Sequence, residues 1–123
     1  MKKLTREQVE VRRRWTEALR SGEYQQGIRF LNKDGRFCCL GVLCEVSGVH
    51  KKRHPDGETM YEGWTCILPG SMVEAAGLCS GLGYLGLNGS PSLTELNDSN
   101  DFTFDEIADV IDLDTLMRQD GAL

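Results

Sequence analysis

One almost uninterrupted apolar run, residues 38–46 (CCLGVLCEV), most strongly constrains how this chain of 123 residues can fold. The run is apolar on nearly every side and stops before Ser47 and Gly48. Such a segment belongs in the interior of a domain, and we interpret it as a buried helix, although its periodicity also permits a strand. Gly41, in its middle, costs up to about 1 kcal/mol in a helix relative to Ala, which indicates a close approach by a neighbouring backbone.

Two amphipathic helices are predicted near the two ends of the chain. Thr5 and Gln8 form a capping box before the first helix, and Thr103 and Glu106 form another before the second. Apolar residues recur at helical spacing after each box, until residues 21–22 (Ser-Gly) end the first run. These apolar positions are Leu4, Val11, Trp15, Ala18 and Leu19 in the first helix, and Phe104, Ile107, Ala108 and Ile111 in the second.

Between these helices the sequence predicts two hairpins. Residues 28–38 contain an apolar strand, the strong turn sequence 32–35 (NKDG) and a return strand. Residues 59–61 and 64–68 are predicted to pair around a Glu-Gly turn, and the polar, basic residues 49–57 are predicted to form a loop. Each strand is short and depends on tertiary packing for its stability.

Short helices and a glycine-rich loop are predicted in the remaining part of the chain. Residues 69–78 suggest a helix with Ser71 as N-cap and Gly77 as its end. Residues 81–89 have the glycine content of a loop, and residues 90–98 suggest a helix opened by Ser-Pro and closed by Asn-Asp. We therefore expect one α+β domain, residues 1–123, with short antiparallel strands packed on the central helix and on the two capped terminal helices.

Composition and cysteine usage bear on the compartment. Hydrophobic residues make up 40% and charged residues 27% of the chain, which is ordinary globular usage. The basic start is followed by no apolar run, so we expect neither an export signal nor a membrane anchor. Five cysteines, an odd number, in a chain without an export signal favour reduced thiols in a cytoplasm.

Charge is distributed unevenly along the sequence. Residues 1–36 carry ten Lys and Arg against five Asp and Glu, whereas residues 69–123 carry one against ten. The basic first third and the acidic last third can attract each other within one protomer or between neighbouring protomers, which makes a homo-oligomer possible. The net charge of −5 makes the chain a poor candidate for nucleic-acid binding, because phosphate neutralisation needs a positive face.

Several segments together resemble uncharacterised small proteins of tailed bacteriophages and prophages. They are residues 15–19 (WTEAL), 21–26 (SGEYQQ), 36–45 (RFCCLGVLCE), 92–98 (SLTELND) and 103–108 (TFDEIA). The resemblance implies a phage-encoded accessory protein acting in the bacterial cytoplasm, and it brings no established catalytic residues. The chain departs from that group at residues 72–77, where it has Ala75-Ala76 and the group often has a tryptophan.

Our leading hypothesis is a binding protein without catalytic activity or cofactor, which sequesters a small nucleotide signal used in antiviral defence. Planar guanidinium groups hold phosphate bidentately, while aromatic rings stack on bases. At each position the simpler alternative is a core aromatic, a solvated or paired arginine, or a helix-closing Asn-Asp turn. The candidate ligand-binding residues are Arg13, Trp15, Tyr24, Arg36, Asn97 and Asp98.

Two other classes of function remain open. The acidic last third can bind a host protein by occupying a basic surface. Alternatively, the cysteines with His50 and His54 can form a zinc site, or Cys38 or Cys39 can act as a thiolate at a helix N-terminus. The cysteines lack paired C-x-x-C spacing and match no nucleophile signature, so cysteine as a small buried apolar residue is the favoured interpretation.

Overall fold

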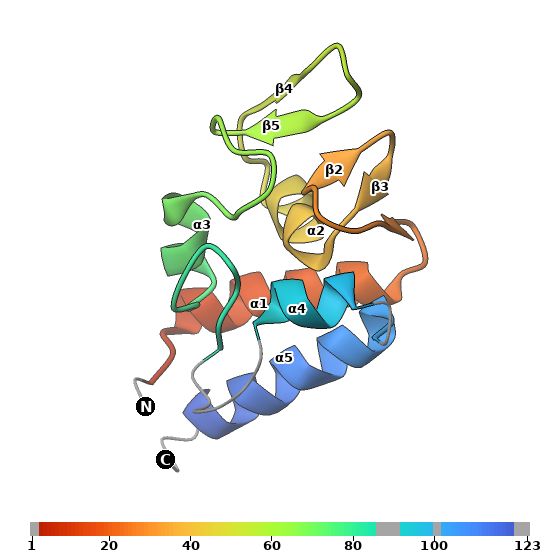
Figure 1. Cartoon of the computed structure of the whole chain (residues 1–123). Coiled ribbons are helices and arrows are strands. Elements are labelled where there is room, and N and C mark those ends of the chain that lie inside the picture. The colour runs from red at the N-terminus through yellow and green to blue at the C-terminus, as the bar shows by residue number, and fades with distance from the viewer. Residues whose placement is uncertain (1–2, 86–91, 100–101, 120–123) are drawn as a thin grey trace.

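The apolar run forms the central helix, α2 (Cys39–Val46), in a computed structural model that describes residues 3–85, 92–99 and 102–119 (Figure 1). Every residue of α2 from Cys39 to Cys44 is buried. Gly41 is required by the close approach that the sequence predicted, because a Cβ there would overlap the carbonyl oxygen of Leu31. The helical interpretation of this segment is therefore confirmed.

The two capped helices, α1 (Arg6–Arg20) and α5 (Phe104–Gln119), pack side by side beneath α2 (Figure 1). Both predicted capping boxes are present, with the Thr5 hydroxyl accepting from the Gln8 backbone N–H and the Thr103 hydroxyl accepting from that of Glu106. These boxes fix where each helix begins, as the sequence predicted.

Opposite charges join the basic first third of the chain to the acidic last third within one protomer. Arg12 of α1 and Asp114 of α5 form a fully buried ion pair, 2.8 Å between Nη1 and Oδ2. Arg20 pairs with Asp109 at 2.7 Å and with Asp112 at 2.8 Å on the surface. Much of the charge asymmetry seen in the sequence is therefore compensated between α1 and α5.

The first hairpin exists, but it is displaced from its predicted position. A three-stranded sheet has the order β1–β3–β2, in which β1 is Gln25–Gln26, β2 is Asn32–Lys33 and β3 is Arg36–Phe37. The β2–β3 turn is Asp34–Gly35, with φ of 53° and 80°. The predicted strand at residues 28–31 is wrong, because Arg29 has a φ of 70° and turns the chain away from an extended path.

The second hairpin pairs β5 (Thr59–Tyr61) with a strand that the sequence analysis assigned to a loop. That partner is β4 (Lys51–Arg53), antiparallel to β5. Residues 64–68 contain only the single bridge between Tyr61 and Trp64, since the Thr65 carbonyl accepts instead from the N–H of Leu31. The predicted Glu-Gly turn is present, but the strand expected after it is not.

Two short helices complete the described chain. Helix α3 (Gly70–Ala75) has Pro69 as its N-cap and not the predicted Ser71, whose hydroxyl donates to Glu62 instead. Gly77, with a φ of 68°, follows the end of the helix. Ser92 caps α4 (Leu93–Asp98), whereas residues 86–91, including the predicted Ser-Pro opening, lie outside the described residues.

The α+β class is confirmed. Among the described helices, none has both the length and the apolar character that crossing a bilayer requires.

Candidate anion-binding site

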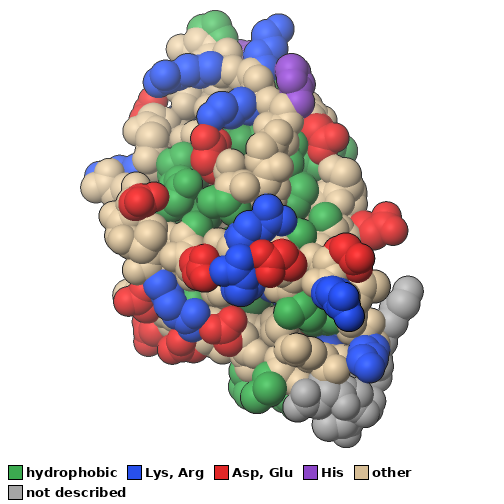
Figure 2. Space-filling view, turned by 180° about the vertical axis from the view of Figure 1, so that it is seen from behind, with side chains coloured by type: hydrophobic (Ala, Val, Ile, Leu, Met, Phe, Trp, Pro, Cys, Tyr) green, Lys and Arg blue, Asp and Glu red, His purple; other side chains and the backbone are tan. Residues whose placement is uncertain are grey.

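The two hairpins lie at the end of the molecule opposite α5, and cationic side chains gather there. Figure 1 shows β2–β3 and β4–β5 together above α2. Figure 2 shows Lys, Arg and His side chains at this end with a few Asp and Glu side chains among them, whereas Asp and Glu side chains lie together with Lys and Arg side chains toward the opposite end. The hairpins are joined by a bridge between Lys33 and Glu58 and by a 2.9 Å bond from the Asp34 N–H to the Gly57 carbonyl.

Strand register sorts the side chains of β2–β3 between its two faces. Lys33 is paired with Arg36, and Asn32 is paired with Phe37. Because neighbouring residues of a strand point to opposite faces, Lys33 and Arg36 share one face, whereas Asn32 and Phe37 share the other. A pocket lies on each side of this hairpin.

The first, which we name the Arg36 pocket, has a volume of about 510 Å³. Its lining combines three cations, two apolar side chains and one carboxylate: Arg29, Lys33, Arg36, Ile28, Phe30 and Asp34. None of the three cations forms an ion pair with another described residue. The ammonium of Lys33 lies 4.7 Å from the centre of the Phe30 ring. The three cations outnumber the one carboxylate of the lining, so the pocket offers a net positive charge beside an apolar surface.

Asn97 and Asp98 hold the loop that lines the Arg36 pocket. The fully buried Asn97 amide donates to the Gly27 carbonyl at 2.8 Å, and its oxygen accepts from the Cys39 N–H at 3.1 Å. The Asp98 carboxylate accepts from the N–H of Arg29 at 3.0 Å, which supports the unusual backbone of that residue. Gly27 lets the loop approach β3, because a Cβ there would lie 2.8 Å from the Cβ of Arg36.

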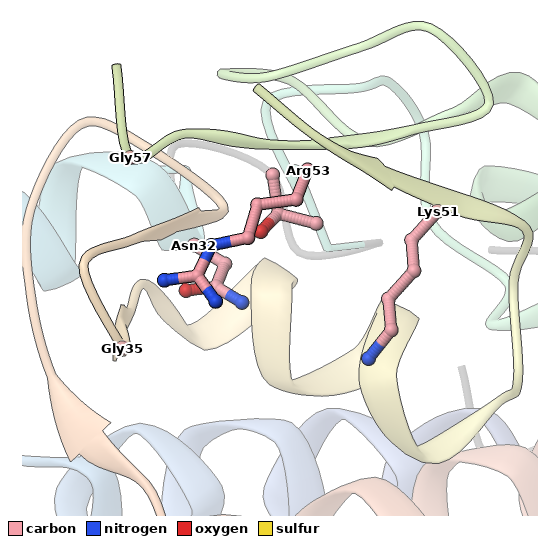
Figure 3. A pocket seen from close by; sticks show the side chains of 6 residues that line it. Asn32, Gly35, Lys51, Arg53 and Gly57 are labelled. Carbon is pink, nitrogen blue, oxygen red and sulfur yellow. The ribbon is translucent and has the colours of Figure 1, made fainter. Parts of the chain in front are cut away.

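The second, which we name the Arg53 pocket, has a volume of about 340 Å³ and lies between the two hairpins (Figure 3). Arg53 and Lys51 share one face of β4, since they are two residues apart. In Figure 3 the Arg53 guanidinium reaches toward Asn32, while Lys51 points toward α2. The remaining lining residues are Gly35, Gly57 and Thr59.

A hydrogen-bonded network positions the polar groups of the Arg53 pocket. Lys51 donates to one oxygen of Glu45 at 2.6 Å, and the Tyr61 hydroxyl donates to the other at 2.9 Å. The Asn32 amide donates in turn to that hydroxyl at 3.3 Å. Burial, with the Glu45 carboxylate beside it, raises the pKa of Tyr61 above its ordinary value, so the phenol stays a protonated donor.

The sequence-predicted site residues are only partly brought together. Arg36 lines the Arg36 pocket, and Asn97 and Asp98 support it from behind. Tyr24 packs edge-on against Phe37, with ring centres 5.2 Å apart. Their role in binding stays a prediction, and the positions of the other two candidates require a correction.

Trp15 and Arg13 lie elsewhere on α1. Trp15 has no exposed surface and donates through Nε1 to the Cys39 carbonyl at 2.8 Å, so it is a core residue and not a stacking platform. Arg13 is exposed but pairs with Glu10 and Glu17 on its own helix. We therefore leave both out of the candidate site.

Sequence reasoning missed several site residues that the fold brings in. Lys33, Lys51 and Arg53 were not among its candidates, although the basic composition of residues 49–57 was apparent. Correct pairing of β4 with β5 would have placed Lys51 and Arg53 on one face, and that pairing was the missing signal.

The buried thiols are unsuited to nucleophilic chemistry. Cys38, Cys39 and Cys44 are buried, and burial raises the pKa of Cys38 and of Cys44 to about 12. Burial also raises the pKa of Cys39, so the suggested thiolate at the start of α2 is wrong. Over residues 3–85, 92–99 and 102–119, no three His, Cys, Asp or Glu side chains form a group that could hold a metal ion.

Fold and site together define a small α+β domain with two basic pockets on its hairpin end. The chain belongs to a family described as a domain of unknown function (DUF8296), whose sequence model matches residues 7–115. The matched region contains all of α1 except Arg6, both hairpins and most of α5. Comparison with curated proteins and with solved structures gave no match.

Proposed function

We propose that this chain binds a small nucleotide-class ligand in the Arg36 pocket, and that it sequesters the ligand without transforming it. The setting we propose is a bacteriophage accessory protein in the host cytoplasm, which rests on the sequence resemblance. The observation that carries the binding proposal is the set of three cations around this pocket, none with an ion-pair partner among the described residues.

The chemistry of the lining suits a phosphate attached to an apolar group. The guanidinium groups of Arg29 and Arg36 can each donate two parallel hydrogen bonds to phosphate oxygens. Phe30 and the 42% exposed Ile28 supply apolar surface on which the planar face of a base can rest. Asp34 is the single carboxylate in the lining and leaves the local balance positive.

Calorimetry and native mass spectrometry with AMP and ATP test this proposal. We expect binding that weakens as salt rises, and an affinity at least tenfold lower in Arg36→Gln, which loses one charge-assisted contact. The matched control is Arg14→Gln on the outer face of α1, whose affinity should equal that of the wild type. Equal affinities of Arg36→Gln and Arg14→Gln for the nucleotides would place the ligand outside the Arg36 pocket. The native mass spectrum also gives the number of subunits.

A protein partner is the second candidate, and the outer face of α5 favours it. Leu113 and Leu116 are 54% and 57% exposed there, and acidic residues of the same helix are exposed as well, among them Asp105 and the Arg20-paired Asp109. An apolar stripe flanked by carboxylates fits a partner with a basic, apolar groove. Retention of one host protein in a pull-down, lost at high salt and in Leu113→Ser/Leu116→Ser, would favour this alternative.

A further inference from the structure

The Arg36 and Arg53 pockets lie on opposite sides of the β2–β3 hairpin. A third depression, of about 500 Å³, lies at the hairpin tips. It shares Asp34 with the Arg36 pocket, and it shares Arg53 and Gly57 with the Arg53 pocket. An elongated ligand can therefore pass from one pocket to the other along the surface.

The Arg53 pocket has its own centre for an anion. Lys51 is held by Glu45, but Arg53 forms no ion pair with any described residue. The Arg53 guanidinium points into the pocket beside the Asn32 amide (Figure 3), and Thr59, its cross-strand partner, lies in the same lining. These groups are hydrogen-bond donors arranged around one small space, which suits a phosphate.

The acidic tip separates the two positive centres. Asp34 lies between them, and Asp56, in the tip depression, sits 3.2 Å from His54. Glu58, bridged to Lys33, adds a further carboxylate near the tip. Carboxylates repel phosphate, so the favoured positions for two phosphates are the two pockets and not the ridge between them.

Hairpin thickness sets the spacing between these positions. A layer of side chains keeps sheets packed face to face about 10 Å apart, so anions held by side chains on opposite faces of one hairpin are separated by about 10 Å or more. The phosphates of a nucleoside triphosphate are joined through single oxygens and are too close together to occupy both pockets. Phosphates separated by nucleosides can reach both.

We propose that the ligand is a short oligonucleotide, with one phosphate held by Arg36 and its neighbours and another held by Arg53 across the hairpin. This inference rests on the proposed function, because it adds a second subsite to the same binding face. It assigns Arg53 the recognition of a second, distant phosphate, and it accounts for cations both on the Lys33–Arg36 face of β2–β3 and on the side of β4 that faces Asn32.

Calorimetry with three probes, AMP, ATP and the trinucleotide pApApA, tests the inference. We expect the wild type to bind pApApA at least tenfold more tightly than either AMP or ATP. The three phosphates of ATP carry more charge into one pocket, but they are too close together to occupy both pockets. Arg53→Gln should lower the affinity for pApApA to about that for AMP and leave AMP binding unchanged. Arg36→Gln should weaken binding of all three probes, and Arg14→Gln should weaken none.

The outcomes separate the two proposals. If ATP binds as tightly as pApApA, or if Arg53→Gln keeps the preference for pApApA, the second subsite is refuted while the Arg36 pocket stands. If the wild type binds none of the probes, the proposed function fails and the inference fails with it. Arg53 is exposed on a hairpin strand, so circular dichroism of Arg53→Gln should match the wild type and exclude misfolding as the cause.

Discussion

Replacement of Asn97 by Ala should destabilise the fold more than any other single change in a polar side chain near the site. The Asn97 side chain is fully buried and connects α4 to the start of α2 and to the loop before β2. Its oxygen accepts from the N–H of Cys39 and from the Gln26 amide, both at 3.1 Å, and its nitrogen donates to the Gly27 carbonyl. Alanine removes all of these contacts at once.

The magnitude follows from the two backbone groups left without a partner. A buried donor or acceptor that loses its partner costs about 1–3 kcal/mol, so losing the partners of the Cys39 N–H and the Gly27 carbonyl costs about 2–6 kcal/mol. Domains of this size have a free energy of unfolding of about 5–15 kcal/mol. The variant should therefore be folded but marginal.

Urea denaturation followed by circular dichroism measures this loss. With a denaturant slope of about 1–3 kcal/mol/M, we expect the midpoint to fall by about 1 M or more. Asn32→Ala is the matched control, since that half-buried amide donates only one 3.3 Å bond to the Tyr61 hydroxyl and should cost about 1 kcal/mol or less. Equal midpoint shifts in the two variants would refute our account of Asn97.

Three further predictions concern the core and the thiols. Gly41→Ala places a Cβ on the Leu31 carbonyl and should cost about 3 kcal/mol or more in urea denaturation, whereas Gly70→Ala, with open space around it, should be neutral. Of the five thiols, only the two exposed ones should react with Ellman's reagent in the native state at pH 8, and all five in denaturant. Burial raises the pKa of Cys38 and of Cys44 from 9.0 to about 12. The contribution of these two protonated thiols to the free energy of unfolding is therefore complete below pH 9 and falls as pH rises toward 12. An unchanged urea midpoint between pH 8 and pH 11 would contradict this prediction.

The helices could be predicted from the sequence because their signals are local. A capping box lies within one turn, so Thr5 and Gln8 fix the start of α1 without information from elsewhere in the chain. The apolar run of α2 is equally self-contained, and Gly41 signalled a neighbour without revealing that the neighbour is Leu31. Local chemistry determines where these elements begin and that they are buried.

Strand pairing could not be predicted because it depends on partners distant in sequence. Residues 51–53 are polar and exposed, so no alternation of apolar residues marks them as a strand. The strand exists because β5 supplies its backbone partners. Since the candidate pockets lie on the faces that these pairings create, the error in pairing left Lys51 and Arg53 out of the predicted candidate residues.

The net charge of a chain does not describe the charge at a particular pocket, and the reason is spatial. Of the acidic residues in the last third, Asp114, Asp109 and Asp112 are compensated by arginines of α1. At physiological salt, charges interact strongly only within about 8–10 Å. The acidic end of the molecule therefore contributes little to the electrostatic potential at the hairpins. There, Arg36 and Arg53 have no ion-pair partner among the described residues. A chain of net charge −5 can therefore present a positive binding face, and the local balance of charge around each pocket, not the total, determines which ligands it attracts.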